Sequence, residues 1–290
     1  NSSNLINPQG FSNKITMFGG NLKKENNNMG KSLGVYGTSE SLYGIKLDKS
    51  ILTGLEWASY TDDAEGLEPA YMDYANDTFV DNGWLDRWPF NEIKPCLFNS
   101  NNEVVGCLDP NDYTKLADGT TVDIESDSSG YVMVEFPKIY YHLDRDDDFI
   151  YIQVSNVARE GFTCDCHVYK GVELDKLYIS AYLNGSPITE TKGFRIHSNT
   201  KINSNTARGY TTTYYGYLKN LDGERYEFLP YNVVKMLQCL YLVMFRHTDS
   251  QTAIGTGFTS EKSTHTTGLL NQKGMYYGTN DYSTGVKVFG

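Results

Sequence analysis

LPYNVVKMLQCLYLVMF, residues 229–245, predicts the main helix of this chain and with it the fold class. Proline near the start suits the first turn of a helix, where its missing N–H is not needed. Lys235, Gln238 and Arg246 fall away from the apolar stripe. The spacing predicts a core helix of about 16 residues with one broad apolar face. That predicted face comprises Val233, Val234, Leu237, Leu240, Tyr241 and Met244.

Short runs of alternating or β-branched apolar residues precede this helix and predict strands. The runs are 42–47, 104–108, 131–136, 139–143, 149–154 and 177–183. Runs 139–143 and 149–154 flank Asp144 to Asp148, which predicts a hairpin with a charged, solvated tip. Trp84 and Trp88 are expected in the core or as loop plugs. Many strands and one long helix predict an α+β fold with few helices and long loops.

Composition argues against binding to nucleic acid and against insertion into a membrane. The net charge of −11 over 290 residues, without a visible basic patch, argues against nucleic acid. The longest apolar run, Cys239 to Phe245, is seven residues, whereas a membrane-spanning helix needs about 20. We therefore expect no membrane insertion. The five Cys are too sparse for a disulfide scaffold and favour a reduced or cysteine-indifferent setting.

Residues 1–35 differ from the rest, because Asn, Ser, Gly and Lys dominate them. This composition predicts an extended N-terminal arm with little core of its own, followed by a β-rich body over residues 36–290. The isolated apolar residues Ile15, Met17 and Phe18 would attach the arm to a partner chain. A plain terminal tail is the alternative.

No motif predicts catalysis, a metal or a cofactor. Counting from Asp144, the sixth and twelfth residues are Phe149 and Ser155, not the Gly and Glu of a calcium loop. Cys164-Asp165-Cys166-His167 lacks the second ligand pair of a zinc site, so a local structural role is favoured. No nucleophile elbow occurs. A glycosidase-like pair of carboxylates stays open, since an acidic chain offers many candidates.

Two tyrosine-rich stretches, 209–217 and 274–282, have loop-like composition. A tyrosine ring offers a flat apolar face with a polar end, which suits stacking on sugars and anchoring of interfaces. The alternative is that these rings fill the core of a loop-rich fold. The candidate ligand-binding residues are Tyr210, Tyr214, Tyr215, Tyr217, Tyr276, Tyr277, Asn280 and Tyr282.

An ordered series of segments gives the chain a family resemblance. After the helix come DSQTAIGTGF (249–258), TGLLN (267–271) and KGMYYG (273–278), and before it VEFPKI (134–139) and KLYISAY (176–182). Over about residues 36–290 the chain resembles a group of tailed-phage and prophage structural proteins. The proteins of that group look like members of the C-type-lectin fold, in the variant found in formylglycine-generating enzymes. The resemblance implies a twisted mixed sheet with helices and long ordered loops.

The resemblance also sets functional expectations. Family members continue with a Gly-x-x-x-Trp-Gly-Asn segment where this sequence reaches Gly290, so the body is expected to lack its closing segment. The formylglycine-generating enzyme is an oxidase with a pair of catalytic cysteines in its C-terminal part. This sequence has no matching pair, so the resemblance implies binding rather than oxidation. The implied role is a virion protein of the tail tip, fibre or baseplate that is assembled in the host cytoplasm and acts extracellularly.

The resemblance implies three kinds of partner: other virion proteins, a host cell-surface glycan or protein, and copies of the chain itself. Phage fibres are commonly trimers, so a trimer is the expected homo-oligomer. Two alternatives remain from the sequence. One is a structural neck, capsid or tail decoration protein without a receptor role. The other is a glycan hydrolase.

Overall fold

The computed structural model describes residues 40–51, 57–76, 78–99, 103–125, 131–182 and 229–254, together with the backbone of four short strands outside these ranges. The predicted arm, residues 1–35, lies outside the described residues. The predicted closing-segment boundary near Gly290 lies outside them as well.

A four-stranded antiparallel sheet forms the first layer. Its strands run in the order β2 (Ala58–Asp62), β1 (Leu42–Asp48), β10 (Phe149–Ser155) and β9 (Tyr140–Arg145). The pairing of β9 with β10 confirms the predicted hairpin. Its acidic tip is exposed, and Asp146 accepts the backbone N–H of Phe149 to close the turn.

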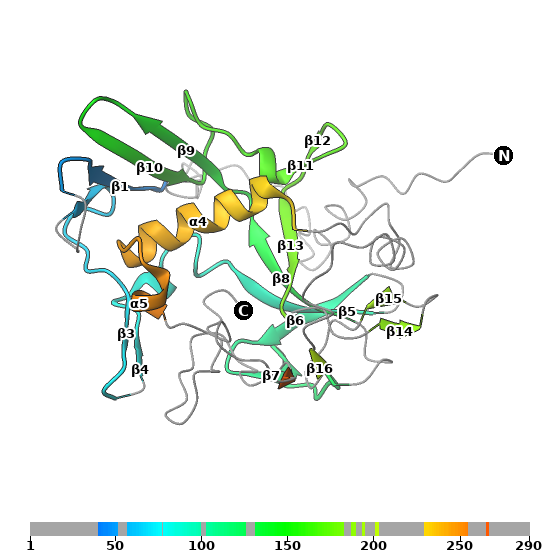
Figure 1. Ribbon diagram of the computed structural model, residues 1–290. Coiled ribbons are helices and arrows are strands. Elements are labelled where there is room, and N and C mark those ends of the chain that lie inside the picture. The colour runs from blue at the N-terminus through cyan, green and yellow to red at the C-terminus, as the bar shows by residue number, and fades with distance from the viewer. Residues whose placement is uncertain are drawn as a thin grey trace, which may run out of the picture.

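A five-stranded antiparallel sheet forms the second layer, and Figure 1 shows it on the other side of helix α4 from the β9–β10 hairpin. Its order is β13 (Lys176–Ser180), β8 (Tyr131–Pro137), β5 (Lys94–Phe98), β6 (Val104–Asp109) and β7 (Asp112–Leu116). Strand β8 is buried over its whole central part, which explains its nearly continuous apolar sequence. Strand β13 ends at Ser180, earlier than predicted.

The remaining elements are short. They are β3 (Tyr71–Asp73), β4 (Thr78–Val80), β11 (Val168–Tyr169), β12 (Val172–Glu173), β14 (Pro187–Thr189), β15 (Gly193–Phe194), β16 (Lys201–Ile202), β17 (His265–Thr266), the 3-10 turns η3 (Trp84–Asp86) and η4 (Asp165–His167), and helix α5 (Ser250–Ile254). The short strands pair as four antiparallel hairpins or ribbons.

Helix α4 (Tyr231–Phe245) confirms the predicted helix. Pro230 is its N-cap, and Arg246 ends it in a left-handed conformation with φ 48°. The predicted apolar face is wrong in part, because Val234, Leu237 and Tyr241 are only half-buried. The helix is apolar on nearly every side, so the sheet it packs against selects the buried stripe. That stripe comprises Val233, Met236, Cys239, Leu240, Val243, Met244 and Phe245.

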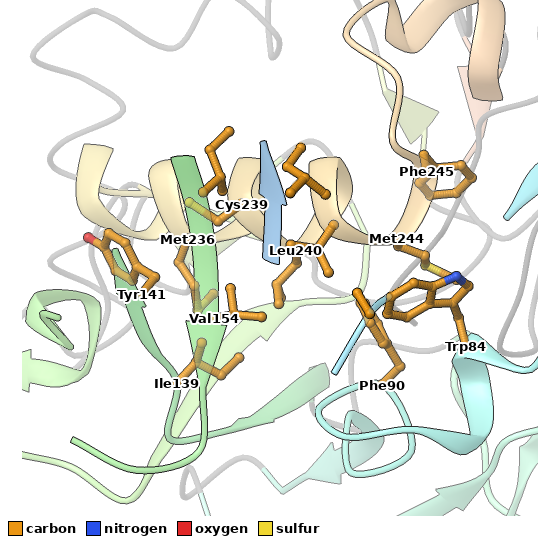
Figure 2. Close-up of a cluster of buried hydrophobic side chains, with 14 of the residues drawn as sticks. Trp84, Phe90, Ile139, Tyr141, Val154, Met236, Cys239, Leu240, Met244 and Phe245 are labelled. Carbon is orange, nitrogen blue, oxygen red and sulfur yellow. The ribbon is translucent and has the colours of Figure 1, made fainter. Parts of the chain in front are cut away.

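The main core lies between α4 and the inner face of the four-stranded sheet. Figure 2 shows Met236 and Leu240 pointing from the helix toward the strands, with Trp84 and Phe90 beneath its C-terminal end. Trp84 is 0% exposed and donates Nε1–H to the Glu68 carbonyl at 2.8 Å. Its ring and that of Phe90 form a T-shaped pair with centroids 5.8 Å apart. Trp84 and the buried Trp88 are therefore core residues, as predicted.

The architecture is α+β, mostly sheet with few helices, as the sequence predicts. Every strand pair in the described part of the chain is antiparallel, so the mixed sheet implied by the resemblance is not found there. Among the described helices, none is both long and apolar enough to cross a membrane.

The buried stripe of α4 can be tested with neighbouring residues. Met236 is 0% exposed and Leu237 is half-buried, although the sequence pattern favours Leu237. Met236→Ala should lower the free energy of unfolding by about 2–5 kcal/mol, because it opens a cavity in the core. Leu237→Ala is the matched control and should cost clearly less. Urea denaturation measures both, and the reverse order would contradict the described packing.

Candidate functional site: the outer face of the four-stranded sheet

One row of side chains crosses the face of the four-stranded sheet that points away from α4. Strand register aligns Thr61 on β2, Gly44 on β1, Gln153 on β10 and His142 on β9. Residues adjacent to these along the strands, such as Ile45, are buried against the helix. Because side chains alternate along a strand, the row lies on the opposite, outer face. We call these four residues and Asp62 the cross-sheet row.

Asp62 joins the row through an unusual backbone conformation. The register sets it opposite Tyr43, whose ring contacts Trp84 in the core, so simple alternation would direct Asp62 inward. Its φ of 59° is left-handed and ends the strand. The Oδ2 atom then accepts the Thr61 hydroxyl at 2.8 Å and the Gln153 amide at 2.8 Å.

Gly44 is required by this arrangement, since the side chains of Asp62 and Gln153 meet above it. A Cβ atom added at Gly44 would lie 2.3 Å from Thr61 Oγ1 and 2.5 Å from Asp62 Oδ2. Both distances are far below van der Waals contact. The β1 strand therefore leaves a gap in the row, and the Asp62–Gln153 hydrogen bond spans it.

His142 ends the row on β9. Its Nδ1 lies 3.4 Å from Gln153 Oε1, and its ring packs against Phe162 with centroids 5.1 Å apart. The contact with Gln153 uses Nδ1, so the Nε2 atom of His142 points away from Gln153. The row thus presents a carboxylate, an amide and an imidazole in sequence, which are groups that exchange hydrogen bonds with hydroxyls.

Aromatic rings flank the row toward the β9–β10 tip. Phe149 and Tyr151 share the outer face with Gln153 and are half-buried, with ring centroids 6.2 Å apart. Lys46 Nζ lies 4.5 Å above the Phe149 ring, and the Tyr151 hydroxyl donates to Asp146 Oδ2 at 2.9 Å. Rings and hydrogen-bonding groups therefore occur side by side on one strand-built surface.

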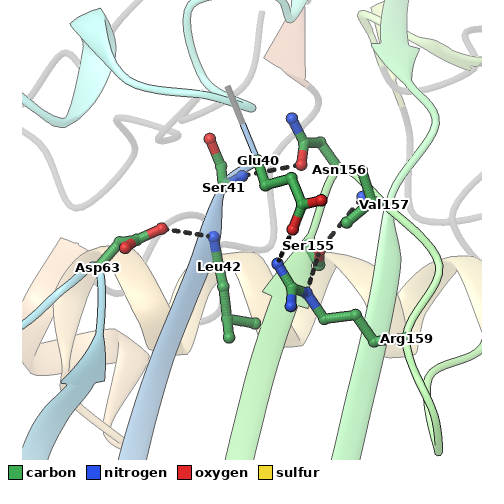
Figure 3. A network of polar contacts seen from close by, with 8 residues as sticks. All are labelled: Glu40, Ser41, Leu42, Asp63, Ser155, Asn156, Val157 and Arg159. Atoms are coloured by element: carbon green, nitrogen blue, oxygen red, sulfur yellow. Dashed lines mark hydrogen bonds and ion pairs between the residues drawn. The ribbon is translucent and has the colours of Figure 1, made fainter. Parts of the chain in front are cut away.

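A second polar network ties Glu40 and Ser41 to the residues that follow β10. It lies at the end of the sheet opposite the β9–β10 hairpin tip. Figure 3 views it with α4 behind the strands. Arg159 donates to Glu40 Oε2 at 3.0 Å and to Ser155 Oγ at 3.1 Å. Ser41 N–H donates to Asn156 Oδ1 at 2.9 Å. The chain is therefore fixed to the sheet from Glu40 onward, and we call these contacts the Glu40 clamp.

The Cys164–His167 segment forms the η4 turn at the N-terminal end of α4. Asn232 on the helix donates to the Asp165 carbonyl at 2.7 Å, and the Tyr141 hydroxyl donates to Asp165 Oδ1. Burial raises the pKa of Cys166 to about 12, which leaves the thiol protonated and a poor nucleophile at neutral pH. Within the described ranges, no group of three or more His, Cys, Asp and Glu side chains is arranged to hold a metal ion.

His167 is the buried titratable group of this turn. It is 0% exposed, and its Nε2 accepts the Ile139 N–H at 3.2 Å. Burial lowers the pKa of His167 to about 4, so the ring is neutral at physiological pH and Nδ1 holds the proton. Nδ1 is buried without a hydrogen-bond partner among the residues that the structure describes. These contacts join η4 to the residue that leads into β9.

The pKa of His167 predicts a pH-dependent stability. In the unfolded chain the ring gains a proton as pH falls through 6.5, whereas the folded ring stays neutral until about pH 4. The folded state therefore loses stability as pH falls through this window, by about 3 kcal/mol in total. His167→Gln should remove that part of the pH dependence. Urea unfolding of both proteins across the window measures it, and equal acid sensitivity would contradict the assignment.

All the site residues predicted from sequence lie outside the described residues. These are Tyr210, Tyr214, Tyr215, Tyr217, Tyr276, Tyr277, Asn280 and Tyr282, together with Ile15, Met17 and Phe18 of the arm. The cross-sheet row was missed by sequence reasoning. Alternation assigns Gly44 and Gln153 to polar faces of their strands, but only the register shows that the strands are neighbours.

The chain was also compared with known proteins. No protein-family model, no curated protein and no solved structure matched it. A function for this chain is therefore inferred from its own residues and from the sequence resemblance.

Proposed function

We propose that this chain is a phage virion protein that binds a glycan on the host cell surface, with the cross-sheet row as part of its binding surface. The observation that supports this most is the alignment of Asp62, Gln153 and His142 across four strands next to the rings of Phe149 and Tyr151. We further propose the lectin-like fold that the sequence resemblance implies.

The chemistry of the row favours a sugar over other ligands. Sugars present hydroxyls on their edges and C–H groups on their ring faces, so they need planar hydrogen-bonding groups beside aromatic rings. The cross-sheet row supplies the first and Phe149 with Tyr151 the second. Strand backbones hold these groups more firmly than loops would. The tyrosine-rich stretches 209–217 and 274–282 are proposed to add contacts to the same ligand.

The Glu40 clamp supports a separate attachment role for the arm. Because the chain is fixed to the body from Glu40 onward, binding of residues 1–35 to other virion proteins or sister chains would leave the sheet in place. Assembly as a homo-oligomer, with a trimer as one form, belongs to this proposal. So does a location on the virion that faces the extracellular medium.

Loss of the row should weaken host binding. Gln153→Ala removes the amide that links Asp62 to His142, and we expect about tenfold weaker binding of the soluble protein to host cells, equivalent to about 1.4 kcal/mol. Gln238→Ala is the matched control, because Gln238 is exposed on α4, away from this face. Binding is measured by flow cytometry with labelled protein, and by competition with phage adsorption.

Three outcomes would contradict the proposal. Equal binding by the two variants would exclude the row as a contact surface. An internal position in the assembled particle, with no competition for adsorption, would instead indicate a neck, capsid or tail decoration protein. Release of reducing sugars from host glycans, abolished by a single carboxylate substitution, would indicate a hydrolase.

Deletion of residues 1–35 should separate attachment from folding. The Glu40 clamp lies beyond the deletion, so the shortened protein should keep its melting temperature within the error of a thermal scan. It should fail to enter particles when it is supplied in place of the full chain. Circular dichroism and particle composition measure the two effects. Unfolding of the shortened protein would show that the arm belongs to the core.

A further inference from the structure

Two cysteines lie directly opposite each other on neighbouring strands of the five-stranded sheet. Cys96 on β5 pairs with Cys107 on β6, and their sulfur atoms are 3.6 Å apart. Directly opposed residues in an antiparallel pair have Cα atoms roughly 4.5 or 5.5 Å apart. Both values lie inside the range of about 4.4–6.8 Å found in disulfides. The register therefore places the two cysteines at a Cα separation that a disulfide can bridge.

The two thiols differ in access. Cys96 is 0% exposed and packs with Phe98 and Met133, whereas Cys107 is only half-buried. An incoming reagent therefore reaches Cys107 first, and Cys96 lies behind it. This is the arrangement of an attacking thiol beside a resolving thiol.

The two thiols also differ in acidity. The hydrogen bond between the sulfurs raises the pKa of Cys96, and burial raises it further. The same hydrogen bond lowers the pKa of Cys107; burial and the Glu135 carboxylate partly offset this, and Lys94 and Lys176 lower the pKa further. Burial raises the pKa of Cys166 and of Cys239. Of Cys107, Cys166 and Cys239, Cys107 therefore has the most acidic thiol and is the best nucleophile.

We propose that Cys96 and Cys107 form a redox modification site, at which exchange with a small-molecule disulfide such as oxidised glutathione converts the two thiols into a cross-strand disulfide. This inference goes beyond the proposed function and does not depend on it. It concerns a different sheet from the cross-sheet row.

The reaction has two balanced steps. The Cys107 thiolate attacks one sulfur of oxidised glutathione, which forms a Cys107–glutathione mixed disulfide and releases one glutathione thiolate. The Cys96 thiol then gives its proton to a glutathione thiolate, and its sulfur attacks Cys107 Sγ. This breaks the mixed disulfide bond and releases the second glutathione as a thiolate, which takes up the proton that Cys107 lost on ionising. In total, the two protein thiols are oxidised and one molecule of oxidised glutathione is reduced to two thiols.

The bond would clamp β5 to β6 near the centre of the sheet. The two strands are joined by a short connection, in which the Glu103 N–H donates to Asn99 Oδ1 at 3.0 Å. A covalent link across this hairpin restricts the unfolded chain, so the oxidised protein should be the more stable form. The link needs little movement in the folded state, because the register is already in place.

The test uses the full chain, fully reduced and then incubated with oxidised glutathione. The sequence contains five Cys, so joining one pair should reduce the thiols titrated in denaturant from five to three. Peptide mapping by mass spectrometry should locate the link between Cys96 and Cys107. The urea midpoint should rise on oxidation and return to its starting value after reduction with dithiothreitol.

Single substitutions separate the two roles. Cys107→Ser should abolish the disulfide, whereas Cys96→Ser should accumulate a stable glutathione adduct at Cys107, because the resolving thiol is missing. Cys164→Ser is the matched control and should still form the link.

Retention of all five thiols by the wild-type protein would overturn the proposal. A link between any other pair, or an adduct at Cys107 that persists in the wild-type protein, would overturn it as well. Mapping of the wild-type chain decides the question even if one variant fails to fold.

Discussion

Packing of α4 against one face of the four-stranded sheet is the constraint on which the rest of the described structure depends. Met236, Leu240 and Met244 cover the inner face, and burial of this apolar surface is the main favourable term in folding. None of the described helices packs on the outer face. Polar side chains on that face can then hydrogen-bond to one another. The cross-sheet row is thus a by-product of one-sided packing, which alternation along the strands makes possible.

Local sequence predicted the elements far better than their arrangement. The strands at 42–47, 131–136 and 149–154 and the helix after Pro230 follow from period and turn chemistry, which are properties of neighbouring residues. The pairing of β1 with β10 joins segments about a hundred residues apart, and no local pattern encodes it. For the same reason, α4 alone could not reveal which of its apolar stripes is buried.

The candidate site was harder to predict than the fold because it depends on exceptions to the regular patterns. Strand alternation would direct Asp62 inward, and only its left-handed backbone brings the carboxylate to the outer face. The cysteines show the same limit. Their separation along the chain says nothing of register, so Cys96 and Cys107 look isolated until β5 and β6 are paired.

The gap at Gly44 has a mechanical consequence. Neighbouring strands are already joined by their backbone ladder, but β2 and β10 are not neighbours, since β1 lies between them. The Asp62–Gln153 hydrogen bond passes over that strand and links the two directly, and Gln153 extends the connection to His142 on β9. Shear between the outer strands therefore strains side-chain contacts as well as the ladder. These side-chain contacts therefore add to the backbone ladder in resisting shear between β2 and β9.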